Sequence, residues 1–580
     1  MKKMLLCISL LVALGLLAAC NRGGNEPAPV DQNQPPAATP APPAATPAPV
    51  EDTPAGSGFD YINWDEHRTF TWFILPTPVN PYFTSYDEEP VANYLMNRFN
   101  VTIEFEQPVV GTERDALALK MASGRFSDAI DLVHYVGSIA QLYEDGIIID
   151  IANWLDYMPN FRNHLETDPD FSRAARDDSG RILLLPIMED EVNPAFSGLL
   201  YRHDILETMT DGNVQFPSGN DVPTTIVDWE YMLPLFQAYF QAAGFVDYAA
   251  LILPPQGVIH FGALMNSFGA YHYFYVRDNT VVAGIFEPAM FEYITTMRDW
   301  FERGWIHQDF LSRTGDMFFN PNPPLVHGGA VGIFYGRLGQ LGDNMSVPEL
   351  GLHFDVRAMP SPMAEGITHQ DMLIRSRSRF RPGGQTAISA TNPDIGRFLA
   401  VIDFLYSDEA RIMQAFGLRA DQIPPGFTTL NRMGMPEGSY WFDAAGNLVL
   451  HENVDKMGGH IVIASINGMR LPGYKGASYV NAMRVQDIVN AHDAWTAQDA
   501  ATETFILPEF LTPTAEEEAI LMANGARFND FRDQMLPQFI MGTIELTEQS
   551  WADFLDQMRE FGKEESREIW QRVYERYLNR

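Results

Sequence analysis

The sequence contains very little cysteine, with only Cys7 and Cys20 among 580 residues. If residues 1–19 are removed as a leader, Cys20 is the only one left. This excludes a disulfide framework, and it excludes metal or nucleophile sites built on cysteine. The chain also lacks H-E-x-x-H, P-loop and G-x-S-x-G motifs, and its histidines are scattered singly. We therefore expect no metal, no cofactor and no catalytic centre.

Basic residues are also scarce. The chain has 39 Lys and Arg against 75 Asp and Glu, a formal charge of −36. Loss of residues 1–19 leaves 37 basic residues and a charge of −38. Such acidity repels phosphate backbones, so nucleic acid is not expected as a partner. It also argues against electrostatic binding to anionic lipid, which leaves acyl chains as the membrane contact.

Long apolar runs are missing except near the amino end. Lys2 and Lys3 precede MLLCISLLVALGLL, the layout of a secretory signal peptide that is too short for a permanent membrane span. It ends in LAAC, which resembles the lipobox of bacterial lipoproteins. The resemblance implies cleavage before Cys20, which would then carry acyl chains such as palmitate. An ordinary secretory signal with a chance cysteine is the alternative.

Residues 20–58 are rich in proline and alanine and show no hydrophobic periodicity. Such a segment cannot bury enough surface to offset its ordering entropy, so we expect a disordered tether. Extended at about 3.1 Å per residue, it could reach on the order of 100 Å. A proline-rich ligand for another domain is the alternative interpretation.

The remainder, about 520 residues, is too long for one hydrophobic core. Residues 68–75 alternate like a strand, and helix–strand patterns follow over 87–106 and 114–135. This order predicts an α/β lobe with a largely parallel sheet. Two strand-like runs, 181–187 and 198–203, flank an acidic loop, as expected where a chain crosses between two lobes.

Several segments of this part resemble, in order and spacing, the extracellular solute-binding proteins of bacterial ABC importers, specifically the LplA-like lipoproteins of carbohydrate-binding family 1. They are SGRILLLPI…GLLYRHDILE…VPTTIVDWEYML, DNTVVAGIFEPAMFEYITTMRDWFERGWIHQDFL, HGGAVGIFYG, ILPEFLTPTAEEEAI and FIMGTIELTEQSWADFLDQMREFGKEESREIWQRVYERY. Each pattern is short, so the resemblance depends on their order over nearly all of 60–580. Leu184 replaces a usual glycine, and the DxDxDG calcium loop of some members is absent.

The resemblance implies a two-lobed, periplasmic-binding-protein-like (type II) α/β fold that is not an enzyme. Such a protein captures a carbohydrate, expected here to be an oligosaccharide, in a cleft between lobes and delivers it to the permease subunits of an ABC importer. We expect a monomer tied through Cys20 to the extracytoplasmic face of the cell membrane. The expected domains are a signal peptide (1–19), the tether (20–58), lobe 1 (59–190 and about 384–420), lobe 2 (191–383 and about 421–510) and a C-terminal helical extension (511–580). Crossings are expected near 188–197 and 383–390.

Neutral sugars present apolar faces and a rim of hydroxyls, so aromatic and carboxylate, amide or guanidinium side chains at strand ends are the candidate ligands. These candidates are Trp72, Asn80, Tyr82, Tyr135, Glu189, Glu191, Asn193, Tyr335, Arg337 and Trp495. Each also has a structural reading: the aromatics could be core residues, and the acids could be solvated hinge residues. Adjacent carboxylates at 189–191 leave a surface glycoside hydrolase or lyase as the alternative function. A non-transport sensor or adhesin is a second alternative.

Overall fold

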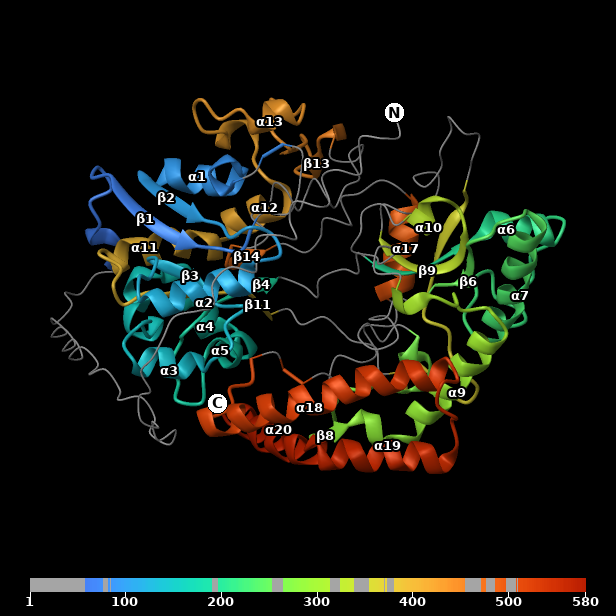
Figure 1. Cartoon of the computed structure of the whole chain (residues 1–580). Coiled ribbons are helices and arrows are strands. Elements are labelled where there is room, and N and C mark those ends of the chain that lie inside the picture. Colours follow the sequence, from blue (N-terminus) through green and yellow to red (C-terminus); the bar gives the residue numbers. More distant parts are fainter. Residues whose placement is uncertain are drawn as a thin grey trace, which may run out of the picture. The chain divides into compact units, whose positions relative to one another are not determined.

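The computed structural model describes residues 58–580 apart from a set of segments within that range. The segments left out are 77–81, 84, 190–196, 253–263, 313–323, 338–353, 370, 373–379, 454–470, 476–485, 497–506 and 509. Two β-sheets, each with its own hydrophobic core and helices, form the two lobes (Figure 1).

The sheet of lobe 1 has the strand order β14-β4-β11-β3-β1-β2. Its strands are β1 (Arg68–Phe73), β2 (Val101–Glu106), β3 (Ala129–Asp131), β4 (Leu185–Glu189), β11 (Phe380–Ile388) and β14 (Gly473–Lys475). All of these strands run in one direction except β11, which is antiparallel to both of its neighbours. The parallel strands therefore end at one common edge, the carboxyl edge of the sheet.

Helices cover both faces of this sheet because its strands alternate. Phe70 and Trp72 of β1 pack in one core with α1 and α11, whereas Phe73 packs on the other face with Leu117 and Leu142. The helices of lobe 1 are α1 (Pro90–Arg98), α2 (Glu113–Ser123), α3 (Ile139–Glu144), α4 (Pro159–Thr167), α5 (Pro169–Ala175), α11 (Ile395–Asp403), α12 (Asp408–Phe416) and α13 (Thr429–Arg432). Short 3-10 helices of this lobe are η1 (Gly58–Tyr61), η2 (Tyr86–Glu88), η3 (Ile151–Tyr157), η11 (Phe404–Tyr406) and η12 (Ala420–Gln422).

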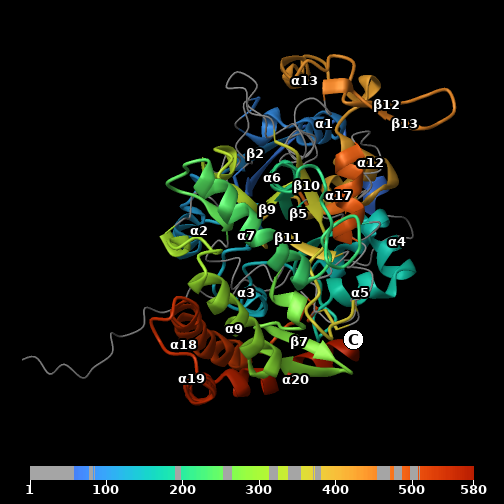
Figure 2. The same cartoon turned by 90° about the vertical axis from the view of Figure 1, so that its right-hand side faces the viewer.

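The sheet of lobe 2 has the order β10-β5-β9-β6, and only β5 opposes the other strands. Leu199 and Tyr201 of β5 pack with α7, whereas Leu200 faces the core that includes Trp495 of α17, so the two helices cover opposite faces (Figure 2). The elements are β5 (Ser197–Arg202), α6 (His203–Met209), α7 (Ile226–Ala242), β6 (Ala249–Leu251), η4 (Met265–Phe268), β7 (Phe274–Arg277), β8 (Thr280–Ala283), η5 (Gly284–Phe286), α9 (Pro288–Glu302), η6 (Phe310–Ser312), α10 (Pro324–His327), β9 (Val331–Arg337), β10 (Val356–Met359) and α17 (Gln486–Thr496).

The two antiparallel strands, β5 and β11, are those that follow a crossing between lobes. The start of β5, Ser197, pairs with the end of β9, Arg337. The start of β11, Phe380, pairs with Met188 near the end of β4. A strand that arrives from the other lobe thus begins at the carboxyl edge and runs against its neighbours. This explains how each sheet can be largely parallel, as predicted, and still contain one reversed strand.

The two-lobed α/β fold is confirmed, but two parts of the predicted division differ. The return to lobe 1 lies between β10 and β11, in 360–379, rather than at 383–390, because Gly383 and Gly384 lie within β11. The range 421–510 was predicted for lobe 2, yet β14 completes the sheet of lobe 1, and Leu430 and Tyr440 pack in its core. Only α17 from that range joins the core of lobe 2.

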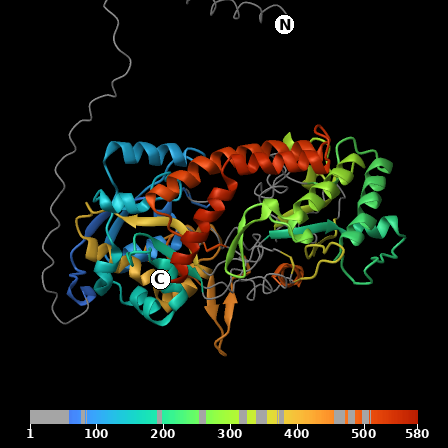
Figure 3. The ribbon, with the colours of Figure 1, turned by 90° about the horizontal axis from the view of Figure 1, so that it is seen from below.

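A hairpin in the same range carries exposed aromatic side chains. Strands β12 (Tyr440–Phe442) and β13 (Leu448–Leu450) pair with each other alone and project from their neighbours (Figure 3). Trp441 and Phe442 are 44% and 42% exposed, whereas Tyr440 is buried. The hairpin is therefore anchored by one face only.

The C-terminal extension consists of α18 (Ala515–Ile540), α19 (Glu548–Glu560) and α20 (Lys563–Leu578), which pack against one another (Figure 1). Thr514 begins α18 with a capping box, since it accepts from the Glu517 amide while the Glu517 side chain accepts from the Thr514 amide. Phe539, Trp551 and Phe554 enter the same core as α9, so the extension shares the hydrophobic core of lobe 2.

Candidate functional site

Trp72, predicted as a ligand contact, is a core residue. Its side chain is fully buried, and its Nε1 donates to Asp131 Oδ1 at 3.2 Å. The same carboxylate accepts from the amide of Leu75 at 3.3 Å and from Thr386 Oγ1 at 2.8 Å. Asp131 therefore joins β3 to the end of β1 and to β11 at the carboxyl edge of lobe 1. The prediction for Trp72 is wrong because both faces of β1 are covered by helices.

Trp495 is also a core residue. It is 7% exposed, and its Nε1 donates to the carbonyl of Leu199 at 3.3 Å. Gly198 leaves the space for this ring, because a Cβ at that position would lie 2.5 Å from the indole. The indole thus fixes α17 to β5 rather than facing a ligand.

Glu189, expected on the crossing loop, is the last residue of β4 at the carboxyl edge, and its side chain is buried. Its register partner across the parallel pair is Lys475 at the end of β14, which is buried as well. Residues in register on neighbouring strands place their side chains on the same face. Glu189 and Lys475 are therefore on the same face of the sheet where the chain leaves lobe 1.

The other predicted residues divide into two groups. Tyr82 is half-buried against the core of lobe 1, and Tyr335 of β9 is half-buried against the core of lobe 2, near the carboxyl edge of its sheet. Asn80, Glu191, Asn193, the side chain of Arg337 and Cys20 lie outside the described residues.

A cavity of about 450 Å³ opens in lobe 1 beyond the end of β3 and beside the start of β4. Its walls come from three separate stretches: residues 133–140 after β3, residues 174–184 between α5 and β4, and residues 510–518 at the start of α18. Gln385 contributes from β11, where a bulge between Arg381 and Thr386 gives it a left-handed backbone with φ 52°. Bulges of this kind redirect a side chain next to a functional site.

Tyr135 is the predicted residue that the structure places in this cavity. It is half-buried and packs against the core beneath β3. Its ring lies over Gly137, where a Cβ would come within 2.5 Å of the hydroxyl. Burial raises the pKa of Tyr135, and the charges of Asp145 and Glu518 act in the same direction. The glycine thus allows the ring to lie close to the backbone.

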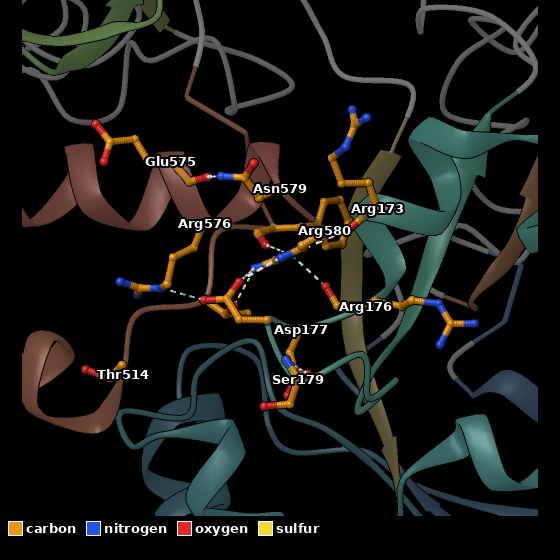
Figure 4. A network of polar contacts seen from close by, with 12 residues as sticks. Arg173, Arg176, Asp177, Ser179, Thr514, Glu575, Arg576, Asn579 and Arg580 are labelled. Atoms are coloured by element: carbon orange, nitrogen blue, oxygen red, sulfur yellow. Dashed lines mark hydrogen bonds and ion pairs between the residues drawn. The ribbon is translucent and has the colours of Figure 1, made fainter.

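Polar contacts hold the wall formed by 510–518 to the wall formed by 174–184. Arg580 Nε donates to Asp178 Oδ1 at 2.8 Å, and its Nη1 donates to the carbonyls of Arg176 at 2.6 Å and Phe510 at 3.0 Å. Arg576 pairs with Asp178 at 2.7 Å and with Glu517 at 2.6 Å. Figure 4 shows Arg576 of α20 and Arg580, just past the end of that helix, beside the loop that carries Asp177 and Ser179. We call this set of contacts the Asp178 latch.

The latch shifts the protonation of its acids. Burial alone would raise the pKa of Asp178, but hydrogen bonds and charge from Arg576 and Arg580 lower it overall. The pKa of Glu517 is lowered in the same way, with Arg576 as the main opposing partner. Both carboxylates are therefore held in the charged form that the arginines require.

Sequence reasoning missed the 174–181 loop and assigned 511–580 only a packing role. The sequence does contain one signal for the start of α18. This signal is the capping-box pattern T-A-E-E at 514–517, which follows two prolines. The long-range pairing of Arg576 and Arg580 with Asp178 leaves no local pattern. Within the described ranges, no group of three acidic, histidine or cysteine side chains is placed to hold a metal ion. No helix in those ranges has the length and apolar character of a membrane span.

Comparison with solved structures identifies the fold. The chain resembles an HMO-binding, ABC-transporter-associated solute-binding protein of Bifidobacterium longum infantis, with a TM-score of 0.67 and 16% identity over 88% of this chain and 99% of that one. It also resembles the alginate-binding protein AlgQ2, with a TM-score of 0.66 and 18% identity over 88% of this chain and 98% of that one. A third similar structure is the Streptococcus pneumoniae substrate-binding protein FusA in complex with kestose, with a TM-score of 0.63 and 16% identity over 88% of this chain and 99% of that one. No protein-family model and no curated protein sequence matches the chain.

Proposed function

We propose that this protein is an extracytoplasmic solute-binding protein that captures an oligosaccharide between its lobes and delivers it to an ABC importer. The main support is topological: the crossings join the carboxyl edges of two largely parallel sheets. Open α/β sheets bind ligands at this edge. The fold is shared over 88% of the chain with carbohydrate-binding members of that transport class.

The crossing from β4 to β5 sets how far apart the two edges can move. Eight peptide units separate Glu189 from Ser197, so an extended chain spans at most about 29 Å between them. A second crossing returns from β10 to β11, and a third leads from β14 to α17. Three connections between the lobes favour a hinge motion that opens and closes them around a solute.

The chemistry of the edges suits a hydroxylated ligand. Tyr82 and Tyr135 on lobe 1 and Tyr335 on lobe 2 are half-buried, so each ring keeps accessible surface. Such rings pack on the apolar faces of sugars, and carboxylate and amide groups bind the hydroxyls. Asn80, Glu191, Asn193 and Arg337 belong to the same strand-end segments and remain part of the proposal, as does Glu189.

We further propose that the protein is a monomeric lipoprotein of the LplA-like group, anchored through an acylated Cys20 on the outer face of the cell membrane. The signal-like segment, the LAAC sequence and the proline-rich tether support this arrangement. The permease subunits of the importer are the expected partners. Mass spectrometry of the amino-terminal peptide tests the anchor: we expect a diacylated Cys20, and an unmodified Cys20 in the membrane fraction would contradict it.

Titration calorimetry of the purified protein with oligosaccharides of defined length tests the transport role, with chromatography of the same mixtures to detect products. Binding with unchanged saccharide is expected. Cleaved or rearranged saccharide would instead identify a carbohydrate-active enzyme. An absence of binding to every saccharide, with binding to peptides, would contradict the carbohydrate assignment.

A further inference from the structure

We infer that the cavity between 133–140, 174–184 and 510–518 is a binding subsite for an uncharged sugar unit and discriminates against acidic sugars. This inference rests on the proposed function and specifies its ligand class. A volume of about 450 Å³ lies within the range of small-molecule pockets. The cavity is therefore large enough for part of an oligosaccharide, and the remainder of the ligand would extend from it.

The apolar part of the lining suits a sugar ring. Tyr135 provides a flat aromatic surface held in place by its contact with Gly137. Leu183, Leu184 and Leu511 add aliphatic surface from two of the walls. Aromatic and aliphatic groups combined with a few polar groups are typical of small-molecule sites.

Most charged side chains of the lining already form ion pairs within the protein. Arg181 lies 2.7 Å from Asp177 and 2.7 Å from Glu144. Asp178 is held by the latch, with Arg576 and Arg580 each at 2.7 Å. Breaking such a pair to bind a charged ligand would give up its hydrogen bonds and charge contact, at a modest cost because Arg181 and Asp178 are partly exposed.

Two charged residues of the described lining remain. Arg176 donates from Nη1 to the carbonyl of Gly180 at 2.8 Å. Glu518 faces the cavity from α18, and burial raises its pKa even though a hydrogen bond with Ser138 lowers it. Its neighbour Tyr135 also has a raised pKa. Both groups indicate surroundings that disfavour additional negative charge, which a uronate would bring.

A neutral sugar meets none of these costs. Its hydroxyls can donate to the Glu518 carboxylate, which accepts at either oxygen, and can exchange hydrogen bonds with Gln385 and Thr512 on the opposite walls. Its ring can pack on Tyr135. The cavity thus offers recognition to a hydroxylated, uncharged ring, whereas the one guanidinium of its described lining without a carboxylate partner, that of Arg176, is bonded to the carbonyl of Gly180.

The test is calorimetry on the full-length protein with neutral oligosaccharides and oligouronates of equal length. Neutral chains should bind at least tenfold more tightly than oligouronates. Tyr135→Ala should weaken the neutral affinity about tenfold, and Glu518→Gln about fivefold, since a neutral amide accepts hydrogen bonds less strongly. Glu516→Gln and Tyr61→Ala, at exposed positions, serve as matched controls and should leave affinity unchanged.

Thermal melting of every variant separates lost binding from lost folding. Tyr135→Phe is a second variant at this position. It retains the ring and should bind nearly as well as the parent. Tighter binding of oligouronates would overturn the inference and leave the proposed function standing. Neutral binding unaffected by both cavity variants would likewise overturn it. An absence of binding to any saccharide would defeat the proposed function itself.

Discussion

Asp403 is the buried acid with the clearest consequence for stability. Its Oδ1 accepts from the Phe161 amide at 2.8 Å, and its Oδ2 accepts from the amide and side chain of Asn160 at 3.1 and 2.7 Å. Burial raises the pKa of Asp403 to about 6, although these hydrogen bonds act in the opposite direction. The folded protein therefore holds this proton more tightly than the unfolded chain does.

The sign of the pH effect follows from that shift. The stabilisation is fully present below about pH 4 and is lost as pH rises through 6, by on the order of 3 kcal/mol for a shift of about two pKa units. Asp403→Asn cannot titrate. The unfolding free energy of the parent relative to this variant should therefore fall between pH 4 and pH 7 in urea titrations. A constant difference would show that Asp403 has an ordinary pKa in the fold.

Trp72 provides the second prediction at this scale. Trp72→Phe removes the hydrogen bond to Asp131 and part of a fully buried ring, so the unfolding free energy should fall by about 1–3 kcal/mol. Oligosaccharide affinity should stay the same, because the ring is enclosed by the core. Denaturation and calorimetry on one preparation measure both quantities. If the affinity fell while the stability stayed the same, Trp72 would instead be a ligand contact.

The sequence predicted which strands carry aromatic residues but not which of those residues are enclosed. Trp72 and Tyr135 both come from strand-like runs, yet Trp72 is covered by α11 while Tyr135, beyond the end of β3, borders a cavity. Alternation assigns a side chain to one of two faces. Whether a helix covers that face depends on contacts between residues hundreds of positions apart, as between Trp72 and Phe398.

At the scale of elements, the extension is attached to the two lobes in different ways. Phe539, Trp551 and Phe554 of α18 and α19 are part of the core of lobe 2. Contact with lobe 1 is made by the arginines of the Asp178 latch, in which Arg580 is buried at 4% exposure while Arg576 and Asp178 are 33% and 25% exposed. Apolar packing is insensitive to salt screening, whereas partly exposed ion pairs weaken with added salt. The latch is therefore the contact that releases more easily.

Asp178→Asn should release this contact without disturbing the core of lobe 2. We expect faster hydrogen exchange in 510–518 and in the last turn of α20, and a stability loss of about 1 kcal/mol that shrinks at high salt. Asp170→Asn, in an exposed pair with Arg173 at 3.1 Å, is the matched control and should change neither the hydrogen exchange nor the stability. Unchanged exchange in both segments would mean that the latch does not hold the wall of the cavity.

Element order was easier to predict than domain boundaries. The strand and helix patterns over 68–135 correspond to β1, α1, β2, α2 and β3. Strand β14 has three residues, too few for a detectable alternation, so its place in lobe 1 could not be predicted. A crossing was expected near 383–390, but Gly383 and Gly384 lie in the bulged strand β11. Glycine marks irregular backbone, and a bulge is one form of it.

For the molecule as a whole, the proposed function requires the two lobes to close around a solute at their carboxyl edges. Both reversed strands, β5 and β11, begin at those edges, so the crossings lie where a ligand would bind. A ligand that contacts both lobes binds the closed state better than the open one and shifts the population toward it. The proteins with similar folds include one solved with a bound sugar, the FusA complex with kestose.

Small-angle X-ray scattering of the purified protein, with and without a saturating oligosaccharide chosen by calorimetry, tests this claim most directly. The tether contributes equally to both samples, so the difference reports on the lobes. We expect the radius of gyration to decrease on binding, and an acidic oligosaccharide that does not bind should leave it unchanged. An unchanged radius of gyration at full saturation would contradict closure around the solute.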